Sequence, residues 1–143
     1  YNPLTARLLT LIIAPIYHLD SNIFYRQIAA ESSFRTLAYS SRGAIGLGQV
    51  KPQTAKYMSL KYPEILLWFP VTNLMISARY TQHLLKKYKN NRSLALASYN
   101  WGETNVDRRI RNLKLETDKD YSYLFADVPE TYAFVKKILQ EKR

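Results

Sequence analysis

Residues 43–55 of the 143-residue chain read GAIGLGQVKPQTA, and this stretch interrupts a sequence that is otherwise patterned for helices. It holds three of the chain's four glycines, Gly43, Gly46 and Gly48. Gly43 and Gly48 have the spacing of the glycines in a phosphate-binding loop, but glutamine and valine follow where that loop needs lysine and then serine or threonine. The glycine order does not match the dinucleotide fingerprint either. Nucleotide binding is therefore excluded, and we expect a loop whose backbone takes positive φ and closely approaches another segment or a ligand.

Helical periodicity dominates on both sides of this loop, and strand-like alternation is weak throughout. Pro3 suits the first turn of one helix, while Asp20 or Ser21, and Ser93, are residues that favour the N-cap. The predicted helices cover residues 4–13, 20 or 21 to 31, 52–60, 70–88, 93–101, 105–113 and 130–140. We therefore expect a mainly α fold with at most a very small sheet, in a single compact domain.

The composition suits a folded domain with a basic surface. Hydrophobic residues make up 47% of the chain, which argues against disorder. The 21 Lys and Arg against 11 Asp and Glu give a net charge of +10, which indicates an anionic partner such as nucleic acid, acidic lipid or a cell-wall polymer. No stretch approaches the ~20 apolar residues of a transmembrane helix. Because the chain opens with Tyr1 rather than Met, we expect any targeting segment to lie upstream.

The residue types that bind metals or act as thiol nucleophiles are scarce. There is no cysteine, so disulfides, Cys-ligated zinc and a thiol nucleophile are excluded. The two histidines, His18 and His83, are too isolated for a His-based metal centre. We expect no metal site and no cofactor.

Glu31 is the carboxylate that the helical pattern singles out. Phe24, Ile28 and Glu31 are spaced i, i+4, i+7, so they project from one face of the predicted second helix. Glu31 thus continues an apolar stripe that is expected to point inward, at the C-terminal end of the helix. Desolvation and the negative end of the helix dipole both raise the pKa of such a carboxyl group, as proton donation near neutral pH requires. From the pattern alone, a boundary glutamate paired with an arginine remains the alternative.

Four motifs in order resemble the soluble lytic transglycosylase family, whose catalytic domain is lysozyme-like and related to goose-type lysozyme. They are ES at residues 31–32, GLGQ at 46–49 with PQTA at 52–55, SYN at 98–100, and ET at 130–131. The family pattern is a Glu-Ser pair, Gly-Leu-Met-Gln with Pro-x-Thr-Ala, Ala-Tyr-Asn, and a Glu-Thr-x-x-Tyr-Val helix. The resemblance spans residues 23–139 and implies a lysozyme-like fold, with residues 1–143 forming one lytic transglycosylase catalytic domain.

The resemblance also implies roles for individual residues. Glu31 matches the family's single catalytic acid/base. Six further residues match positions that hold or line the sugar cleft or face the catalytic glutamate: Ser32, Gly46, Leu47, Gln49, Tyr99 and Asn100. A tyrosine hydroxyl can orient a carboxyl group, and an amide can bind an N-acetyl or hydroxyl group. From the residues alone, Tyr99 stays open as a core tyrosine and Gln49 as an amide that braces the loop.

Three positions depart from the family pattern. Gly48 replaces the usual methionine and removes an apolar contact from the cleft wall, whereas Ser98 replaces alanine, a small-for-small change. Phe134 stands where tyrosine is usual, so a hydroxyl expected near the active site is absent. Because Glu31 is kept, we expect activity.

The implied reaction cleaves the β-1,4 bond between N-acetylmuramic acid and N-acetylglucosamine in peptidoglycan. Glu31 serves as acid and then base, giving a 1,6-anhydro product without water or cofactor. The first alternative is a hydrolytic muramidase, which needs a second carboxylate. Glu103 and Asp107 are candidates, although Glu103 also suits the first turn of a helix. The second alternative is a peptidoglycan-binding or assembly module that has lost catalysis, which the Gly48 and Phe134 departures prompt.

The expected partners and location follow from this substrate. We expect peptidoglycan glycan strands as the partner, a monomeric chain, and a place in the bacterial cell envelope, periplasmic or otherwise exported. Basic clusters at residues 86–89 and 108–111 prompt a nucleic-acid binder as a further alternative, but no nucleic-acid-binding motif accompanies them. We interpret them as a solvated basic face.

Aromatic residues are candidates for stacking on sugar rings. Tyr39, Tyr99 and Trp101 lie in or beside the recognised motifs. Trp68 and Phe69 precede the long predicted helix, and we expect both in the core.

Overall fold

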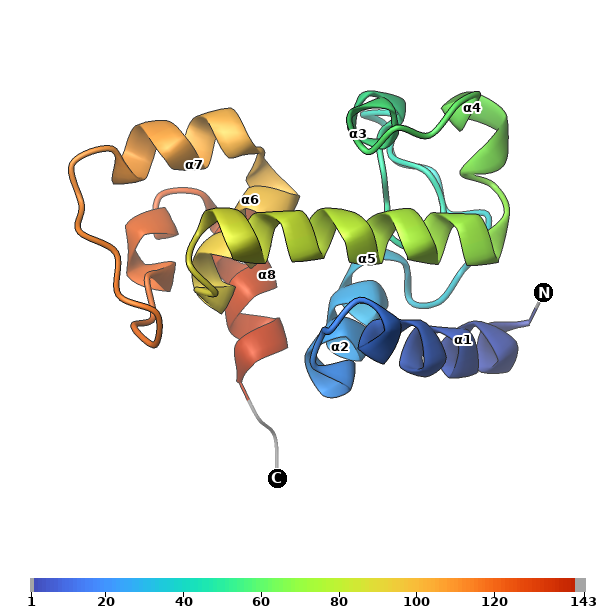
Figure 1. The fold of residues 1–143 in the computed structure, drawn as a ribbon, viewed down its shortest axis with the longest axis horizontal. Helices are drawn as coiled ribbons and strands as arrows, with labels where there is room; N and C mark the ends of the chain where they lie inside the picture. The colour runs from blue at the N-terminus through green and yellow to red at the C-terminus, as the bar shows by residue number, and fades with distance from the viewer. Residues whose placement is uncertain (1, 141–143) are drawn as a thin grey trace. The chain divides into compact units, whose positions relative to one another are not determined.

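The computed structural model describes residues 2–140 as helices joined by loops (Figure 1). The helices are α1 (Pro3–Ile16), α2 (Ser21–Ser32), α3 (Pro52–Tyr57), α4 (Pro63–Leu66), α5 (Pro70–Lys87), α6 (Arg92–Trp101), α7 (Glu103–Ile110), the 3-10 helix η1 (Ser122–Phe125) and α8 (Pro129–Leu139). Within the described residues, strand-like pairing is limited to isolated antiparallel bridges of Ile45 with Tyr39 and with Val50. The mainly helical fold class is therefore confirmed. No helix in residues 2–140 is long and apolar enough to cross a membrane.

The chain's contacts divide it into two compact units, Tyr1–Tyr80 and Thr81–Arg143. The boundary falls inside α5, so this helix begins in the first unit and ends in the second. The predicted catalytic domain of residues 1–143 includes residues 1 and 141–143, which lie outside the described residues.

In the first unit, α1 and α2 pack against each other (Figure 1). Each helix begins at a side-chain cap, because Asn2 accepts a hydrogen bond from the Thr5 N–H and Asp20 accepts one from the Ile23 N–H, both at 2.9 Å. The α1 helix continues three residues past its predicted end. Pro15 is tolerated because it lies in the last turn, where its missing N–H removes one hydrogen bond and interrupts no further turn.

A second apolar cluster of this unit joins the glycine-rich loop to α3, α4 and α5. Its buried members are Ile45, Val50, Ala55, Leu67 and Ile76, and Met58, Leu60 and Trp68 pack against them. The four-residue α4 was not predicted, since it is too short to show helical periodicity. The prediction that Phe69 is a core residue is wrong, because its side chain is 55% exposed. Trp68 is partly buried against the cluster.

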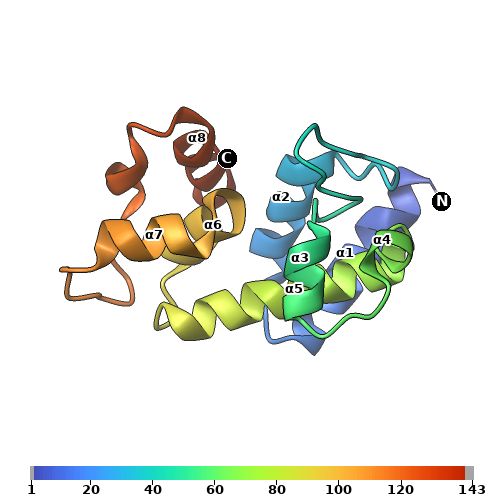
Figure 2. The ribbon, with the colours of Figure 1, turned by 90° about the horizontal axis from the view of Figure 1, so that it is seen from above.

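In the second unit, α6 packs against α7 and α8, and η1 contacts both α6 and α8 (Figure 2). The prediction that Ser93 caps α6 is wrong. Asn91 is the cap, because its Oδ1 accepts hydrogen bonds from the Leu94 N–H at 3.0 Å and from the Ser93 hydroxyl at 2.6 Å. The Nδ2 of Asn91 also donates to three carbonyl oxygens of residues 116–119. Asn91 therefore fixes the start of α6 and the following loop at once.

Two predicted helix boundaries also shift. The helix predicted over residues 52–60 ends at Tyr57, and Ser59 beyond it takes a left-handed conformation with φ +68°. The helix predicted over residues 105–113 runs from Glu103 to Ile110. It begins directly after Gly102, whose φ of +104° breaks the chain direction after α6.

Candidate active site

Glu31 occupies the last turn of α2, on the helix face that the sequence predicts. Phe24 and Ile28 on the same face are 1% and 0% exposed, and Glu31 is half-buried. The inward stripe is therefore present and ends at a carboxylate. The raised pKa of Glu31 stays a prediction.

The turn after Glu31 is held by local hydrogen bonds. The carbonyl oxygen of Ser32 accepts from the backbone N–H and from the Nε of Arg35, both at 3.0 Å. Ser33 and Phe34 both take positive φ, which ends the helix sharply. The hydroxyl of Ser32 is buried and donates to the Ile28 carbonyl at 3.3 Å. Since this bond lies within α2, the role of Ser32 in holding the glycine loop stays a prediction.

The glycine loop folds back on itself between α2 and α3. Ile45 and Val50 exchange backbone hydrogen bonds of 2.9 and 3.1 Å, and the Gly46 N–H donates to the Ala38 carbonyl at 2.7 Å. The side-chain Nε2 of Gln49 donates to the carbonyls of Ala38 at 3.2 Å and Gly46 at 3.0 Å. Gln49 therefore stabilises the loop, which is the structural role that the sequence analysis left open for this residue. Its contact with a substrate stays a prediction.

Asn73, near the start of α5, was missed by the sequence analysis and holds the loop from outside. Its Nδ2 donates to the carbonyls of Ile45 and Leu67, and its Oδ1 accepts from the Gly48 N–H, each at 2.8 Å. The side chain is 1% exposed. The sequence does carry a signal for Asn73, because this polar residue stands beside Leu74 in an apolar helical pattern. An amide that is buried at such a position must form hydrogen bonds within the protein.

Gly46 and Leu47 have structural constraints of their own. Gly46 has φ +72°, and a Cβ atom there would lie 2.5 Å from Asn73 Nδ2 and 3.2 Å from the Leu67 carbonyl oxygen. Both the conformation and the close packing therefore require glycine. Leu47 is 0% exposed, so it packs inside the loop, and its predicted contact with a substrate stays a prediction.

Tyr99 and Asn100 belong to the second unit, at the end of α6, and both are half-buried. Asn100 contacts the first turn of α8: its Oδ1 accepts from the Thr131 hydroxyl at 2.7 Å, and its Nδ2 lies 3.5 Å from a Glu130 carboxylate oxygen. Thr131 is buried. The structure therefore brings the third and fourth sequence motifs together and orients the Asn100 amide through a threonine that the sequence analysis gave no role.

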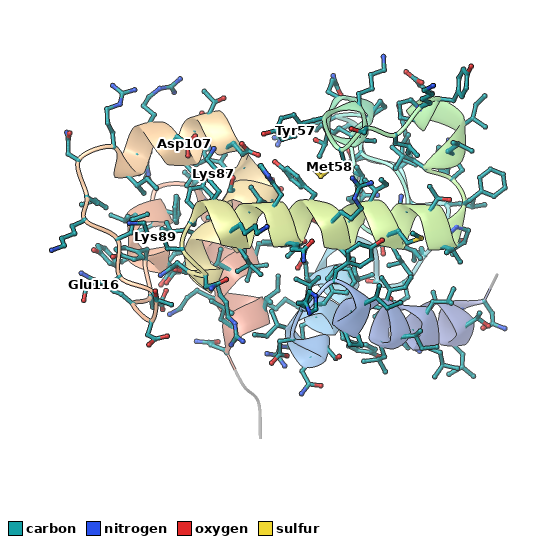
Figure 3. The ribbon with its side chains drawn as sticks, viewed as in Figure 1. Tyr57, Met58, Lys87, Lys89, Asp107 and Glu116 are labelled. Carbon is teal, nitrogen blue, oxygen red and sulfur yellow. The ribbon has the colours of Figure 1, made fainter. Side chains whose placement is uncertain are left out.

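The two candidate second carboxylates, Glu103 and Asp107, lie on α7 and share one cation. Lys87 Nζ contacts Glu103 at 2.9 Å. It also contacts Asp107, at 2.7 Å (Figure 3). The Tyr88 hydroxyl donates to Asp107 at 2.7 Å, and His83 Nε2 lies 3.2 Å from Glu103. Glu103 lies in the first turn of α7, where acidic residues are favoured. This is the structural role that the sequence analysis gave as the alternative to a catalytic one.

This cluster shifts the pKa values of its basic and phenolic members. Burial, together with the hydrogen bond to the Asp107 carboxylate, raises the pKa of Tyr88 to about 12. Partial burial lowers the pKa of Lys87, but the hydrogen bonds to Asp107 and Glu103 outweigh it and hold this pKa well above its ordinary value. Lys87 therefore stays charged, and part of the predicted basic face at residues 86–89 is committed to an ion-pair cluster.

The comparisons with known proteins point to one family. A family model of the transglycosylase SLT domain matches residues 11–122. A Haemophilus influenzae protein assigned as a soluble lytic murein transglycosylase is 33% identical over 118 residues, which cover 76% of this chain and 19% of that protein.

Two solved structures are similar over nearly the whole chain. The lytic transglycosylase Slt of Pseudomonas aeruginosa, as an inactive glutamate-to-glutamine mutant, matches with a TM-score of 0.75 and 26% identity, over 93% of this chain and 22% of that one. The 70-kDa soluble lytic transglycosylase of Escherichia coli matches with a TM-score of 0.73 and 26% identity, over 92% of this chain and 22% of that one. The chain therefore spans about a fifth of the length of these relatives.

The chain belongs to the transglycosylase SLT domain family, a lytic transglycosylase family of peptidoglycan-degrading enzymes. The resemblance carried by the sequence motifs and the lysozyme-like, mainly helical fold class are both confirmed.

Proposed function

We propose that this chain is the catalytic domain of a peptidoglycan lytic transglycosylase in which Glu31 is the single acid/base. The observation that carries the proposal is the half-buried carboxylate at the end of α2, inside the segment that matches the family model. The inactive glutamate-to-glutamine mutant of the similar Pseudomonas aeruginosa enzyme supports an essential glutamate in this class.

The proposed reaction uses one proton in two steps. Glu31, protonated, donates its proton to the glycosidic oxygen while the bond from C1 of the N-acetylmuramyl residue to that oxygen breaks. The resulting carboxylate then takes the proton of the 6-hydroxyl of the same sugar as that oxygen bonds to C1. The product carries a 1,6-anhydro ring, Glu31 is again protonated, and neither water nor a cofactor is consumed.

The loop of residues 38–50 supports this role by its rigidity. Asn73 and Gln49 satisfy its carbonyl and N–H groups from the side, so the loop backbone is fixed before a substrate arrives. A preorganised wall lowers the entropy cost of positioning a glycan strand. We propose that Gly46, Leu47 and Gln49 shape the loop that bounds the sugar cleft, with Ser32, Tyr99 and Asn100 as further binding residues.

Mass spectrometry of peptidoglycan digested by the purified chain tests the reaction. We expect anhydro-muramyl products, and a predominance of reducing-end products would replace the proposal with a hydrolytic muramidase. Glu31→Gln is expected to abolish release of soluble muropeptides, while the matched control Glu116→Gln, an exposed glutamate, keeps it. An active Glu31→Gln protein would contradict the assignment of Glu31.

Variants of Glu103 and Asp107 also distinguish a lytic transglycosylase from a hydrolase. A hydrolase would need one of them as its second carboxylate, yet both are already paired with Lys87. Under the proposed mechanism, Glu103→Gln and Asp107→Asn therefore keep the anhydro product. Loss of cleavage in either folded variant would favour the hydrolase.

The substrate implies a place in the bacterial cell envelope, periplasmic or otherwise exported. Muramyl peptides carry carboxylates, so the net charge of +10 would concentrate the chain on the wall. This attraction is screened by salt. Retention of the Glu31→Gln protein on insoluble wall material should accordingly fall as ionic strength rises.

A further inference from the structure

A cavity of about 680 Å³ lies beside the glycine loop, entirely within the first unit. Residues from the loop, α3, α4 and the turn before α5 line it, among them Tyr39, Arg42, Ile45, Lys56, Glu64 and Trp68. None of its lining residues is among the seven predicted site residues. Tyr39, however, is one of the three aromatic residues that the sequence indicates as candidates for stacking on sugar rings.

Two stacked rings form an aromatic platform in this cavity. The ring centroids of Tyr39 and Trp68 are 5.9 Å apart, with an interplanar angle of 28°. Trp68 packs on the buried cluster of the first unit, while Tyr39 remains 65% exposed. Tyr39 is thus backed by an anchored ring, which holds it in place and leaves much of its surface open to a ligand.

Gly43 lies beside the phenol end of this platform. A Cβ atom at Gly43 would lie 3.9 Å from the Tyr39 hydroxyl, in ordinary van der Waals contact with it. Gly43 also takes φ +84°, a conformation that favours glycine. Glycine therefore suits the backbone conformation of this turn and adds no side chain beside the Tyr39 hydroxyl.

The charges around the platform define the kind of ligand. Arg42 and Lys56 are exposed cations, and Glu64 is an exposed carboxylate. In the part of the chain that the structure describes, none of these three side chains forms an ion pair with another residue. Their sum is one positive charge, which suits a monoanion. Glu64 can accept a hydrogen bond from a hydroxyl or amide N–H, but it would repel a row of phosphates.

We propose that this cavity is a second peptidoglycan-binding site, which takes a muramyl sugar without a stem peptide, with the face of the sugar on Tyr39 and its free lactyl carboxylate at Arg42 or Lys56. The choice of sugar rests on the proposed function. An aromatic ring offers the apolar face of a pyranose a flat contact, and a guanidinium pairs well with a carboxylate. Such a site would hold one part of a glycan strand on the first unit while Glu31 acts on another.

Tryptophan fluorescence can observe this site directly. The chain has two tryptophans, so Trp101→Phe in the Glu31→Gln background leaves Trp68 as the single reporter and prevents cleavage. We expect a saturable change of Trp68 fluorescence with an N-acetylglucosaminyl-N-acetylmuramic acid disaccharide. We expect a weaker response to chitobiose, which lacks the carboxylate. No saturable change with the disaccharide up to millimolar concentration would overturn the proposal, as would a preference for a thymidine oligonucleotide.

Matched variants assign the binding to the platform and its cations. Tyr39→Ala should weaken disaccharide binding about five- to tenfold, the size of an aromatic contact, while Tyr39→Phe keeps it. Arg42→Ala combined with Lys56→Ala should remove the preference for the disaccharide over chitobiose. Tyr62→Ala is the control, because Tyr62 is 73% exposed in the same unit and is not among the residues that line the cavity. Equal affinity of Tyr39→Ala and the parent protein would overturn the proposal.

The two proposals fail separately. Binding at Trp68 is measured in a protein that cannot cleave, whereas the proposed function is tested by the products of the unmodified chain. Anhydro products without a Trp68 response would leave the function intact and refute the second site.

Discussion

The side-chain oxygen of Asn73 accepts a 2.8 Å hydrogen bond from the backbone N–H of Gly48, 25 residues earlier in the chain. The same amide donates to the carbonyls of Ile45 and Leu67. One buried side chain of α5 therefore satisfies three backbone groups, two of them in the glycine loop and one in the turn that precedes α5. The shape of the loop is set as much by this helix as by its own glycines.

Replacing Asn73 should destabilise the protein strongly. Asn73→Ala removes three hydrogen bonds between a buried amide and backbone groups, each of which contributes about 0.5–1.5 kcal/mol. We expect the free energy of unfolding to fall by roughly 3 kcal/mol, measured by urea denaturation. Asn73→Asp keeps the acceptor for Gly48 and loses both donors, so it should also be clearly destabilised. A loss below about 1 kcal/mol for the alanine variant would contradict the clamp.

Gly43 and Gly46, two of the three loop glycines, should respond differently to alanine. Gly46→Ala introduces a Cβ atom 2.5 Å from Asn73 Nδ2 and places alanine at φ +72°. Gly43→Ala has a similar backbone strain at φ +84°, but its Cβ atom would meet only the Tyr39 hydroxyl, at 3.9 Å. Left-handed alanine costs about 1–2 kcal/mol, to which overpacking adds about 1–3 kcal/mol at Gly46 alone. Thermal denaturation should therefore rank Gly46→Ala well below Gly43→Ala, and equal midpoints would refute the packing argument.

Thr131 should act on substrate binding through Asn100. Thr131→Val keeps the volume of this buried residue and removes the hydroxyl that donates to Asn100 Oδ1. If Asn100 binds substrate, KM for soluble peptidoglycan fragments should rise severalfold with kcat nearly unchanged, and stability should fall by about 1 kcal/mol. Thr131→Ser retains the donor and should restore KM. A fall in kcat alone would place the effect elsewhere.

Tyr88 should make the protein sensitive to alkali. Its pKa is raised to about 12 in the folded chain, against an ordinary value near 10. Between these values the unfolded chain has released the phenol proton and the folded chain has not, so unfolding is favoured as pH rises. The contribution is complete below pH ~10, and about 2 kcal/mol is lost by pH ~12.

Urea denaturation between pH 9 and 11 measures this effect. Tyr88→Phe should be less stable near neutral pH, because its hydrogen bonds to Asp107 and Ser98 are gone. Its stability should nevertheless fall less steeply with pH than that of the parent. Tyr123→Phe, at a 55% exposed tyrosine, is the control and should keep the parent slope. Identical slopes for all three proteins would contradict the link to Tyr88.

The sequence by itself determined the local structure. Periodicity predicts each of the longer helices, the stripe of Phe24 and Ile28 places Glu31 at a helix end, and the glycine cluster predicts a turn with positive φ. These features depend on residues within one or two turns of each other. Side-chain spacing and backbone sterics decide them before the chain packs.

Only the tertiary structure decided which distant groups meet. The bonds from Asn73 to the glycine loop, the Thr131 contact to Asn100 and the stacking of Tyr39 on Trp68 join residues that are 25 to 31 positions apart. Asn91 displaced Ser93 as the cap of α6 because its amide also satisfies the carbonyls of a later loop. Local propensities for two neighbouring caps are nearly equal, so a few hydrogen bonds made during packing choose between them.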